Sequence, residues 1–208
     1  MDQKPHIDYY FTTISSFAYL GHWAFQELVK QTGCTVSYKP VQLGKVFAAS
    51  GGLGFGDRHP ARLRTRKLEL QRWSAKRGLD MNLDPKYFPT NPALADCAVI
   101  VLQNRGIDPA PFMGEVMRCV WVKEQDIAQS DTVAHALADC GLDAASVLSD
   151  SGQQEILDLY ETNTTDGIDL DIIGSPSPVY QGEAFWGQDR FELLRDAITS
   201  GRPPYEAG

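Results

Sequence analysis

The sequence predicts an α/β fold in which a β-α-β unit opens the chain, a long helical segment follows, and a β-β-α unit closes it. Two observations carry this prediction. Residues 6–13, HIDYYFTT, are rich in aromatic and β-branched side chains, as buried strands are. Strand-like segments then return only after residue 177, and the residues between the two ends are mostly of helical character.

The first unit begins with the strand over residues 6–13. Ser15 and Ser16 are candidates for the N-cap of the following helix, because a serine hydroxyl accepts a hydrogen bond from the free amides of a first turn. Gly33 is expected to end this helix, and a second strand is expected over residues 34–43. The apolar residues at helical spacing are Phe17, Leu20, Ala24, Leu28 and Val29.

The middle of the chain is expected to be helical. It opens with GGLGFG, residues 51–56, which does not complete a GxGxxG motif because Asp57 follows, so a flexible loop is favoured over a phosphate-binding one. One helix is expected to begin with Asn91 as its cap and Pro92 as its first residue. The predicted helices span residues 61–77, 92–103, 111–123, 131–140 and 153–160.

The C-terminal unit is expected to contain a hairpin and a helix. Residues 178–181 and 183–186 are predicted to pair around Gly182, and residues 189–199 to form a last amphipathic helix. A β-α-β unit completed by a hairpin and a helix is the thioredoxin plan. We therefore predict a thioredoxin-like fold with a large all-helical insertion.

The domain boundaries follow from this plan. The thioredoxin-like domain is expected to comprise residues 1–43 and 169–208, and the helical insertion residues 44–168. A chain of 208 residues is long enough for one such domain with its insertion.

Charge and composition exclude several classes of function. The chain has 27 acidic and 19 basic residues, a net charge of −8, which argues against nucleic-acid and anionic-membrane binding. No apolar run approaches the ~20 residues of a membrane helix, and the N-terminus lacks a secretory pattern. We therefore expect a cytoplasmic protein that acts on a small molecule.

The thiols and imidazoles do not form recognisable motifs. The cysteines form no CxxC pair, so we expect reduced core residues rather than a dithiol redox centre. The histidines have no metal-ligand spacing, so no metal site is expected. The residues concerned are Cys34, Cys97, Cys119, Cys140, His6, His22, His59 and His135.

Basic residues concentrate in one segment. Residues 58–77 hold eight of the 19 basic side chains and a single acid, Glu69. Such a segment is either a solvated helix face or a local anion site that suits a small carboxylate ligand.

Ser15 lies where a predicted strand ends and a helix begins. Backbone amides are unpaired at this end of a helix and the helix dipole is positive, so an anion beside Ser15 is stabilised. A thiolate is such an anion, and its pKa falls in these surroundings. The alternative is that Ser15 is only an N-cap.

Two further segments near the C-terminus have ligand-binding potential. The prolines of GSPSP, residues 174–178, include a candidate cis bond that exposes the preceding backbone, or else two trans prolines interrupt a strand edge. Asp189 either caps the last helix or pairs with a ligand ammonium group.

Three short motifs lie in order along the chain: DYYFTTISSFAYL, KLELQRWSAKRGL and GSPSPVYQGEAFWGQDR. Together they resemble the motifs of 2-hydroxychromene-2-carboxylate isomerases and kappa-class glutathione transferases. DYYFTTISSFAYL, residues 8–20, resembles their opening DFYFDFxSPxSYL. KLELQRWSAKRGL, residues 67–79, resembles their K-x-D-x-x-R-W segment. GSPSPVYQGEAFWGQDR, residues 174–190, resembles their G-V-P-T-F…WGxDR ending. The sequence is thus similar to this family of the disulfide-oxidoreductase-like thioredoxin superfamily along nearly its whole length.

The resemblance implies a homodimer, glutathione as cofactor, and a set of site residues. It places the catalytic serine at Ser15, where related disulfide oxidoreductases have their first cysteine. It implies that Pro176 is cis and that the Ser175 backbone pairs with the cysteinyl group of glutathione. Lys67 and Glu69 would lie near the glutathione site. The γ-glutamyl end would be held by Trp186, Gly187, Gln188 and Asp189.

The chain departs from the family pattern at several positions. Ser16 replaces a proline, and Asp57 stands where the isomerases have a substrate-pocket asparagine, whereas Tyr87 matches a pocket tyrosine. An acid beside an aromatic carboxylate is unfavourable unless it is protonated or paired, so the substrate is affected more than the cofactor. Further departures are Ala18 for Ser, Glu69 for Asp, Ser175 for Val, and the additional proline Pro178.

The function implied is a glutathione-dependent cis–trans isomerase of an unsaturated aromatic or pyruvyl carboxylate, in aromatic catabolism. Reversible addition of the glutathione thiolate would allow the double bond to rotate. The substrate carboxylate would bind Arg64, Arg66 or Lys67, which the sequence does not distinguish. One alternative is a kappa-like transferase, and another is a catalytically silent thioredoxin-fold binding protein, supported only by the Ser16 and Asp57 departures.

Overall fold

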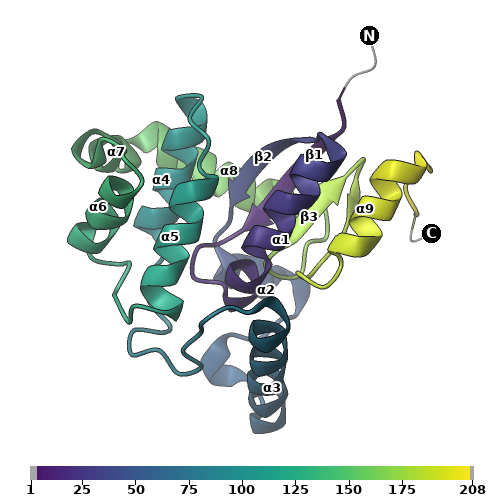
Figure 1. The fold of residues 1–208 in the computed structure, drawn as a ribbon, viewed down its shortest axis with the longest axis horizontal. Helices are drawn as coiled ribbons and strands as arrows, with labels where there is room; N and C mark the ends of the chain where they lie inside the picture. The colour runs from purple at the N-terminus through teal and green to yellow at the C-terminus, as the bar shows by residue number, and fades with distance from the viewer. Residues whose placement is uncertain (1–3, 207–208) are drawn as a thin grey trace.

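A mixed sheet of four strands forms the centre of the fold over residues 4–206, which are the residues described by the structure, a computed structural model (Figure 1). The strand order is β2-β1-β3-β4, with β1 parallel to β2 and antiparallel to β3, and β3 antiparallel to β4. The strands are β1 (His6–Phe11), β2 (Thr35–Pro40), β3 (Ser177–Tyr180) and β4 (Glu183–Ala184).

Helix α1 (Ser16–Thr32) links β1 to β2 as the sequence predicts. Ser15 is its N-cap, since the Ser15 Oγ accepts a hydrogen bond from the Ala18 amide at 3.2 Å. Gly33 ends the helix with a φ of 66°, a conformation that glycine adopts without a Cβ clash, and its N–H donates to the Val29 carbonyl.

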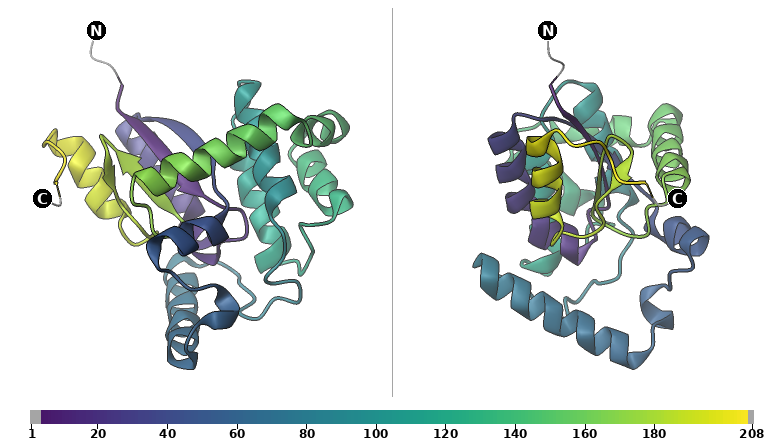
Figure 2. Two further views of the ribbon diagram at one scale, coloured as in Figure 1. Left: turned by 180° about the vertical axis from the view of Figure 1, so that it is seen from behind. Right: turned by 90° about the vertical axis from the view of Figure 1, so that its right-hand side faces the viewer.

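Helices cover both faces of the sheet (Figures 1 and 2). Ile7, Tyr9 and Phe11 of β1 join the core on the side of α1 and α9 (Phe191–Ser200), whereas Tyr10 joins a smaller core on the other side. This alternation follows from the period of two in a strand. On that other side lie α2 (Leu43–Ser50) and α8 (Gln154–Asp169), which contact each other.

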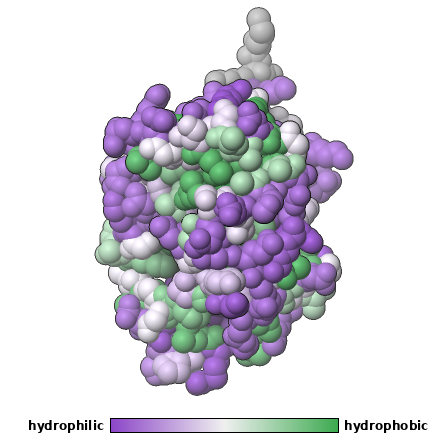
Figure 3. Space-filling model, turned by 90° about the vertical axis from the view of Figure 1, so that its left-hand side faces the viewer, coloured by the Kyte–Doolittle hydropathy of each residue, from purple (hydrophilic) through white to green (hydrophobic). Residues whose placement is uncertain are grey.

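Four helices form a lobe beside the β2 edge of the sheet. They share one continuous apolar core with α1 and β1. Figure 3 views the lobe from the side of α6 and α7, where hydrophilic side chains dominate and apolar ones gather in a few groups among them. The four helices are α4 (Ala93–Asn104), α5 (Ala110–Trp121), α6 (Ser130–Asp139) and α7 (Ala144–Ser151).

A long helix, α3 (Pro60–Arg77), projects from the body of the molecule (Figure 2). A single 3-10 turn, η1 (Phe55–Asp57), precedes it. Two residues of α3 tie it to the sheet domain. Arg66, in the first half of the helix, donates to the Ser16 hydroxyl, and Arg77, at its C-terminal end, donates to the carbonyls of Leu20 and Gln188. These contacts bring the basic segment to the start of α1.

The predicted thioredoxin-like fold with a helical insertion is confirmed, but several element boundaries are wrong. Helices α2 and α7 were not predicted, and the 34–43 strand is shorter because α2 begins at Leu43. Helix α8 continues beyond the predicted residue 160, since its polar second half packs on the sheet through Gly167, where a Cβ would meet Ile172 and Tyr10. Helix α4 begins one residue later than predicted, and the Asn91 side chain accepts from the Ala93 amide at 3.0 Å.

The prediction that Asp189 caps the last helix is wrong. The N-cap of α9 is Arg190, and in residues 4–206 no side chain caps this end of the helix. The Asp189 carboxylate instead accepts a hydrogen bond from the Arg190 guanidinium at 2.8 Å.

Several simple features of the described residues bear on function. No helix within residues 4–206 has the length and apolar character needed to cross a bilayer. In the same range no cluster of three or more His, Cys, Asp or Glu residues is arranged to hold a metal ion. Cys34, Cys97 and Cys119 are free and buried, as predicted for core thiols, whereas Cys140 is free and half-buried.

Candidate functional site

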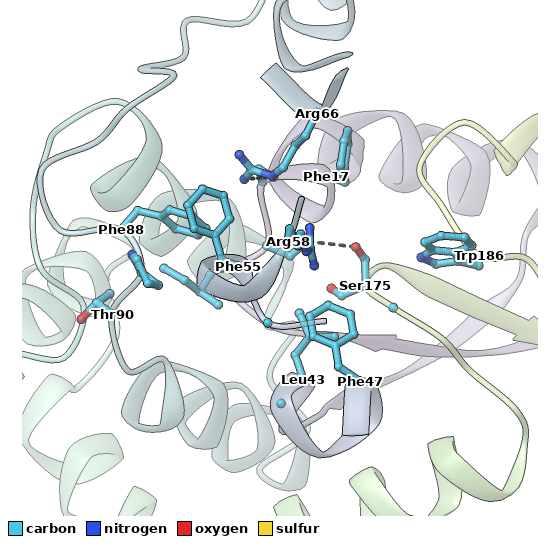
Figure 4. A pocket seen from close by; sticks show the side chains of 17 residues that line it. Phe17, Leu43, Phe47, Phe55, Arg58, Arg66, Phe88, Thr90, Ser175 and Trp186 are labelled. Carbon is cyan, nitrogen blue, oxygen red and sulfur yellow. Dashed lines mark hydrogen bonds between the residues drawn. The ribbon is translucent and has the colours of Figure 1, made fainter. Parts of the chain in front are cut away.

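A cavity of about 330 Å³ opens at the start of α1 (Figure 4). Four segments that are distant in sequence meet around it: the β1–α1 loop, α2, the segment from η1 into α3, and the loop before β3. Aromatic rings dominate its wall, and two guanidinium groups face it. The side chains labelled in Figure 4 are Phe17, Leu43, Phe47, Phe55, Arg58, Arg66, Phe88, Thr90, Ser175 and Trp186.

Ser15 lies at the base of this cavity and is 9% exposed. Its hydroxyl donates to the Ser175 carbonyl at 2.9 Å and accepts from the Ala18 amide. This hydroxyl therefore stands at the N-terminus of a 17-residue helix, where the helix dipole favours negative charge. The Ser15 Oγ is thus the helix cap, and it is also the atom beside which the sequence predicts an anion site.

Ser175 links the two ends of the chain. Its hydroxyl accepts from the Thr12 amide at 3.1 Å, and its carbonyl accepts from Ser15. The Ser175–Pro176 peptide bond is cis, as the resemblance implies. Within residues 4–206 the Ser175 N–H has no hydrogen-bond partner, so a peptide-like ligand can pair with it.

The loop from Trp186 to Asp189 folds back toward this turn. The Gly187 N–H donates to the Pro176 carbonyl at 2.9 Å, and the Trp186 ring packs against Gly174, where a Cβ would clash with it. Trp186 lines the cavity although half of its surface is exposed. Gly187 has a φ of 111°, which favours glycine at this position.

The next two residues of this loop lie away from the cavity. Gln188 is buried, and its Oε1 has no hydrogen-bond partner in the described part of the chain. The Gln188 carbonyl accepts from Arg77 at 3.0 Å, which ties the loop to the end of α3. Asp189 is exposed.

Arg66 is the guanidinium most deeply set in the wall. The Cζ atom of its guanidinium group lies 5.2 Å from the ring centroids of Phe55 and Phe88 and 5.9 Å from that of Trp121. Its Nη2 donates to the Ser16 hydroxyl at 2.9 Å, and it makes no ion pair with a carboxylate among residues 4–206. Burial first, and then the neighbouring Arg58, lower the pKa of Arg66 to about 10.

Arg58 adds a second positive charge to the same wall. It stacks over the Phe47 ring at 5.2 Å, and its Nε donates to the Leu53 carbonyl at 2.9 Å. Burial and then the nearby Arg62 lower its pKa. A cavity with aromatic walls and two partly desolvated guanidinium groups suits an aromatic anion.

The other predicted site residues lie outside the cavity wall. Lys67 is paired with Asp84, and Glu69 is paired with Arg72. Glu69 borders a second groove that adjoins the cavity and shares Phe17, Phe47, Arg58, Arg66 and Trp186 with it.

The two residues predicted to bind substrate lie near the cavity but do not line it. Asp57 is exposed at the end of η1. Tyr87 is 37% exposed and its ring lies 4.8 Å from the Lys86 Nζ, while the adjacent Phe88 faces the cavity. Their roles stay predictions.

Sequence reasoning did not identify the aromatic wall. Phe55 lies within the glycine-rich stretch interpreted as a flexible loop, and Phe47 belongs to a helix that was not predicted. Phe88 stands next to the predicted Tyr87 but carried no motif. The available signal was the concentration of basic side chains in residues 58–77, which includes Arg58 and Arg66.

The chain belongs to the DsbA-like thioredoxin domain family, whose model matches residues 6–199. The chain is 29% identical over 198 residues to the 2-hydroxychromene-2-carboxylate isomerase of Sphingobium xenophagum, covering 92% of this chain and 97% of the relative. It is 26% identical over 220 residues to glutathione S-transferase kappa 1 of Caenorhabditis elegans, covering 98% and 95%. The resemblance drawn from three motifs is confirmed, and these relatives are enzymes.

Solved structures agree on the fold. A 2-hydroxychromene-2-carboxylate isomerase superposes with a TM-score of 0.81 at 22% identity, over 94% of this chain and 95% of that one. The cytosolic disulfide reductase DsbM from Pseudomonas aeruginosa, solved with GSH, superposes with a TM-score of 0.66 at 16% identity, over 94% and 96%.

Proposed function

We propose that the protein is a glutathione-dependent cis–trans isomerase of an unsaturated aromatic or pyruvyl carboxylate. The observation that carries the proposal is the position of the Ser15 hydroxyl, at a helix N-terminus and at the base of a cavity with aromatic and guanidinium walls. The sequence relatives named as isomerases support the reaction class.

The described residues fit glutathione at this position. The unpaired N–H of Ser175 is available to the backbone of a peptide ligand, which would bind there as an added strand does. The thiol would then lie beside Ser15. Trp186, Gly187, Gln188 and Asp189 are proposed for the γ-glutamyl end, with Pro176 fixing the turn and Lys67 and Glu69 nearby.

Bound glutathione supplies a thiolate that adds reversibly to a conjugated carbon, so that a double bond becomes single and can rotate. Ser15 is proposed to donate its hydroxyl proton in a hydrogen bond to the sulfur anion in place of the Ser175 carbonyl. The hydroxyl and the α1 N-terminus together lower the thiol pKa. This stabilisation keeps the nucleophile ionised at neutral pH.

For the substrate carboxylate we propose Arg66 among the three basic residues that the sequence left open. Lys67 is paired with Asp84, and Arg64 is exposed and does not line the cavity. Arg66 faces the cavity and lies among three rings, against which an aromatic substrate can stack. Asp57 and Tyr87 are proposed to contact the substrate from the cavity mouth.

A kappa-like transferase, which conjugates an electrophile and keeps the adduct, is the second candidate. The groove that adjoins the cavity favours it, because it offers room for a larger electrophile. We also propose a homodimer, which the family resemblance implies, and a cytoplasmic location, which the scattered reduced cysteines favour. Sedimentation would test the first and cell fractionation the second.

The test combines calorimetry with product analysis. Glutathione should bind the purified protein, and a cis unsaturated aryl pyruvate incubated with both should give its trans isomer with glutathione unconsumed. A stable adduct would favour the transferase. Absence of glutathione binding would contradict both and favour a silent binding protein.

A further inference from the structure

Directly below the Ser15 loop lies a carboxylate that the proposed chemistry does not use. Asp96, in the first turn of α4, is completely buried. Its Oδ1 accepts hydrogen bonds from the Thr13 amide and the Thr13 hydroxyl, both at 2.8 Å. Its Oδ2 accepts from the Thr12 hydroxyl and from the Tyr160 hydroxyl of α8, again at 2.8 Å. In all four bonds the Asp96 carboxylate is the acceptor.

Three of these four bonds fix the loop that carries Ser15. Thr12 and Thr13 follow β1 directly, and their amides turn away from the sheet: the Thr12 amide donates to the Ser175 hydroxyl and the Thr13 amide to Asp96. The Ser15 amide in turn donates to the Thr12 carbonyl at 3.1 Å. A continuous chain of hydrogen bonds therefore runs from Asp96 to Ser15 and Ser175.

We propose that Asp96 is a positioning residue for Ser15: its buried carboxylate, brought in by the helical lobe, holds Thr12 and Thr13 so that the Ser15 hydroxyl and the Ser175 backbone face the cavity together. This inference assigns the α4 helix a role in the site. The positioning role of Asp96 depends on the proposed function in one respect only, namely that the ligand is glutathione.

Within residues 4–206 no cation compensates the charge of the Asp96 carboxylate. Among the described residues no Lys, Arg or His lies within ion-pair distance of Asp96. The titratable groups that interact with it are Tyr160 from α8 and Cys97 on α4 itself. The partners from the β1–α1 loop, Thr12 and Thr13, are neutral. Burial therefore outweighs the hydrogen bonds and raises the pKa of Asp96 to about 6.

Protonation would change the hydrogen bonds that hold the loop. A proton on Oδ2 turns that oxygen into a donor, so the Thr12 and Tyr160 hydroxyls must reorient. Tyr160 has an alternative acceptor, the Val41 carbonyl at 3.4 Å. The position of the loop should therefore depend on pH around the pKa of Asp96, which gives a signature that a purely structural contact lacks.

The first experiment measures amide hydrogen exchange by NMR and needs no glutathione. Asp96→Ala leaves the Thr13 amide buried without an acceptor, so its exchange should become at least about tenfold faster than in the wild type. Asp96→Asn keeps one oxygen for the Thr13 amide and should restore most of the protection. Val147→Ala, in the buried core of α7, is the matched control for global destabilisation.

The second measurement is the pH dependence of the Thr13 amide chemical shift. In the wild type it should inflect at about pH 6, the pKa raised by burial of Asp96. The inflection should disappear in Asp96→Asn and move to higher pH in Tyr160→Phe, because the lost hydrogen bond favours the ionised form. This measurement decides the proposal even where Asp96→Ala does not fold.

Glutathione affinity provides the third arm. Asp96→Ala should weaken binding by about tenfold, whereas Asp96→Asn should stay within about threefold of the wild type. Two results would overturn the proposal. One is a Thr13 amide that exchanges no faster in Asp96→Ala than in Val147→Ala. The other is a wild-type Thr13 chemical shift that shows no inflection, corresponding to about one proton, between pH 5 and pH 7. A wild type that binds no glutathione would refute the proposed function alone, since the NMR arms still decide the role of Asp96.

Discussion

At the scale of single residues, the site depends on a few polar groups in an apolar setting. The Ser15 hydroxyl has two partners, the Ser175 carbonyl and the Ala18 amide, and only the first must be exchanged for a ligand to receive its proton. The Arg66 guanidinium has a single hydroxyl partner, Ser16, and three aromatic neighbours. Both groups thus retain hydrogen-bonding capacity for a ligand in the cavity.

Replacing Arg66 should weaken the binding of aromatic anions. Hydrogen bonds to charged groups contribute about 1.5–3 kcal/mol, so Arg66→Gln should raise the Kd of a simple aromatic carboxylate such as salicylate by about 10- to 100-fold. Arg66→Lys should recover part of the affinity, since it keeps the positive charge but not the planar guanidinium group that can form two hydrogen bonds with a carboxylate. Calorimetry with salicylate measures this without turnover.

The control for this prediction is Arg64→Gln, on the exposed face of the same helix. It removes the same charge from the molecule while leaving the cavity wall intact. Equal losses of salicylate affinity in both variants would show a general charge effect and would contradict the assignment of Arg66.

At the scale of elements, the loop between β4 and α9 is placed by its backbone and not by capping. Gly187 turns the chain, its N–H bonds to the Pro176 carbonyl, and Arg77 from α3 holds the Gln188 carbonyl. Because the N-cap of α9 is Arg190, a change at Asp189 does not disturb the helix.

Asp189→Asn therefore removes the charge and its exposed ion pair with Arg190 without removing a helix cap. If Asp189 pairs with the α-ammonium group of glutathione, its loss should raise the Kd by about three- to tenfold, a modest effect because the pair is exposed. The helix content and unfolding midpoint should not change. Asp196→Asn, on the exposed face of α9, is the control, and equal glutathione affinity in the wild type and Asp189→Asn would refute this role.

The sequence predicts local features of these elements well and long-range ones poorly. The N-cap Ser15 and the C-terminal Gly33 of α1 are decided within a few residues, so their patterns are visible in the chain. The sequence predicts a helix that ends at residue 160, whereas α8 continues to Asp169, because its polar second half packs on the sheet through Gly167.

The parts of the site that the sequence did not single out depend on tertiary structure. Arg66 and Arg64 are chemically identical in the sequence, and only the direction of each side chain on α3 separates them. Asp96 lies 83 residues from Thr13 and carries no motif. The resemblance pointed to the N-terminal and C-terminal parts of the site, whereas Phe47, Phe55 and Phe88 of the aromatic wall come from residues 44–168 and carry no motif.

At the scale of the whole molecule, the buried charge of Asp96 couples folding to pH. Its pKa is raised from 3.8 to about 6 on folding, so the folded state binds a proton more tightly than the unfolded chain does. The stabilisation from this group is complete below pH 3.8 and is lost as the pH rises through about 6. Protonation of Asp96 removes the free-energy cost of burying its charge, and this cost is larger than the stabilisation lost when its hydrogen bonds weaken.

This coupling predicts a pH-dependent difference between two proteins. From pH 7 to pH 5 the unfolding free energy of the wild type should gain about 1–2 kcal/mol relative to Asp96→Asn, which is neutral throughout. Urea unfolding of both proteins at the two pH values measures the difference. Carboxyl groups with lowered pKa values, such as Glu161 and Glu183, are present in both proteins, so their contributions to the unfolding free energy cancel in the comparison. A difference that is independent of pH would contradict the raised pKa.

The central claim is that Ser15 and the start of α1 form a glutathione thiolate site. The most direct test is a pH titration of the thiolate absorbance at about 240 nm with glutathione bound to the wild type and to Ser15→Ala. We predict that the bound thiol titrates well below free glutathione in the wild type. We expect Ser15→Ala to keep the fold and glutathione binding but to lose most turnover, and in this variant the bound thiol should titrate about one unit or more higher. Identical titration curves for the two proteins with glutathione bound would contradict the claim.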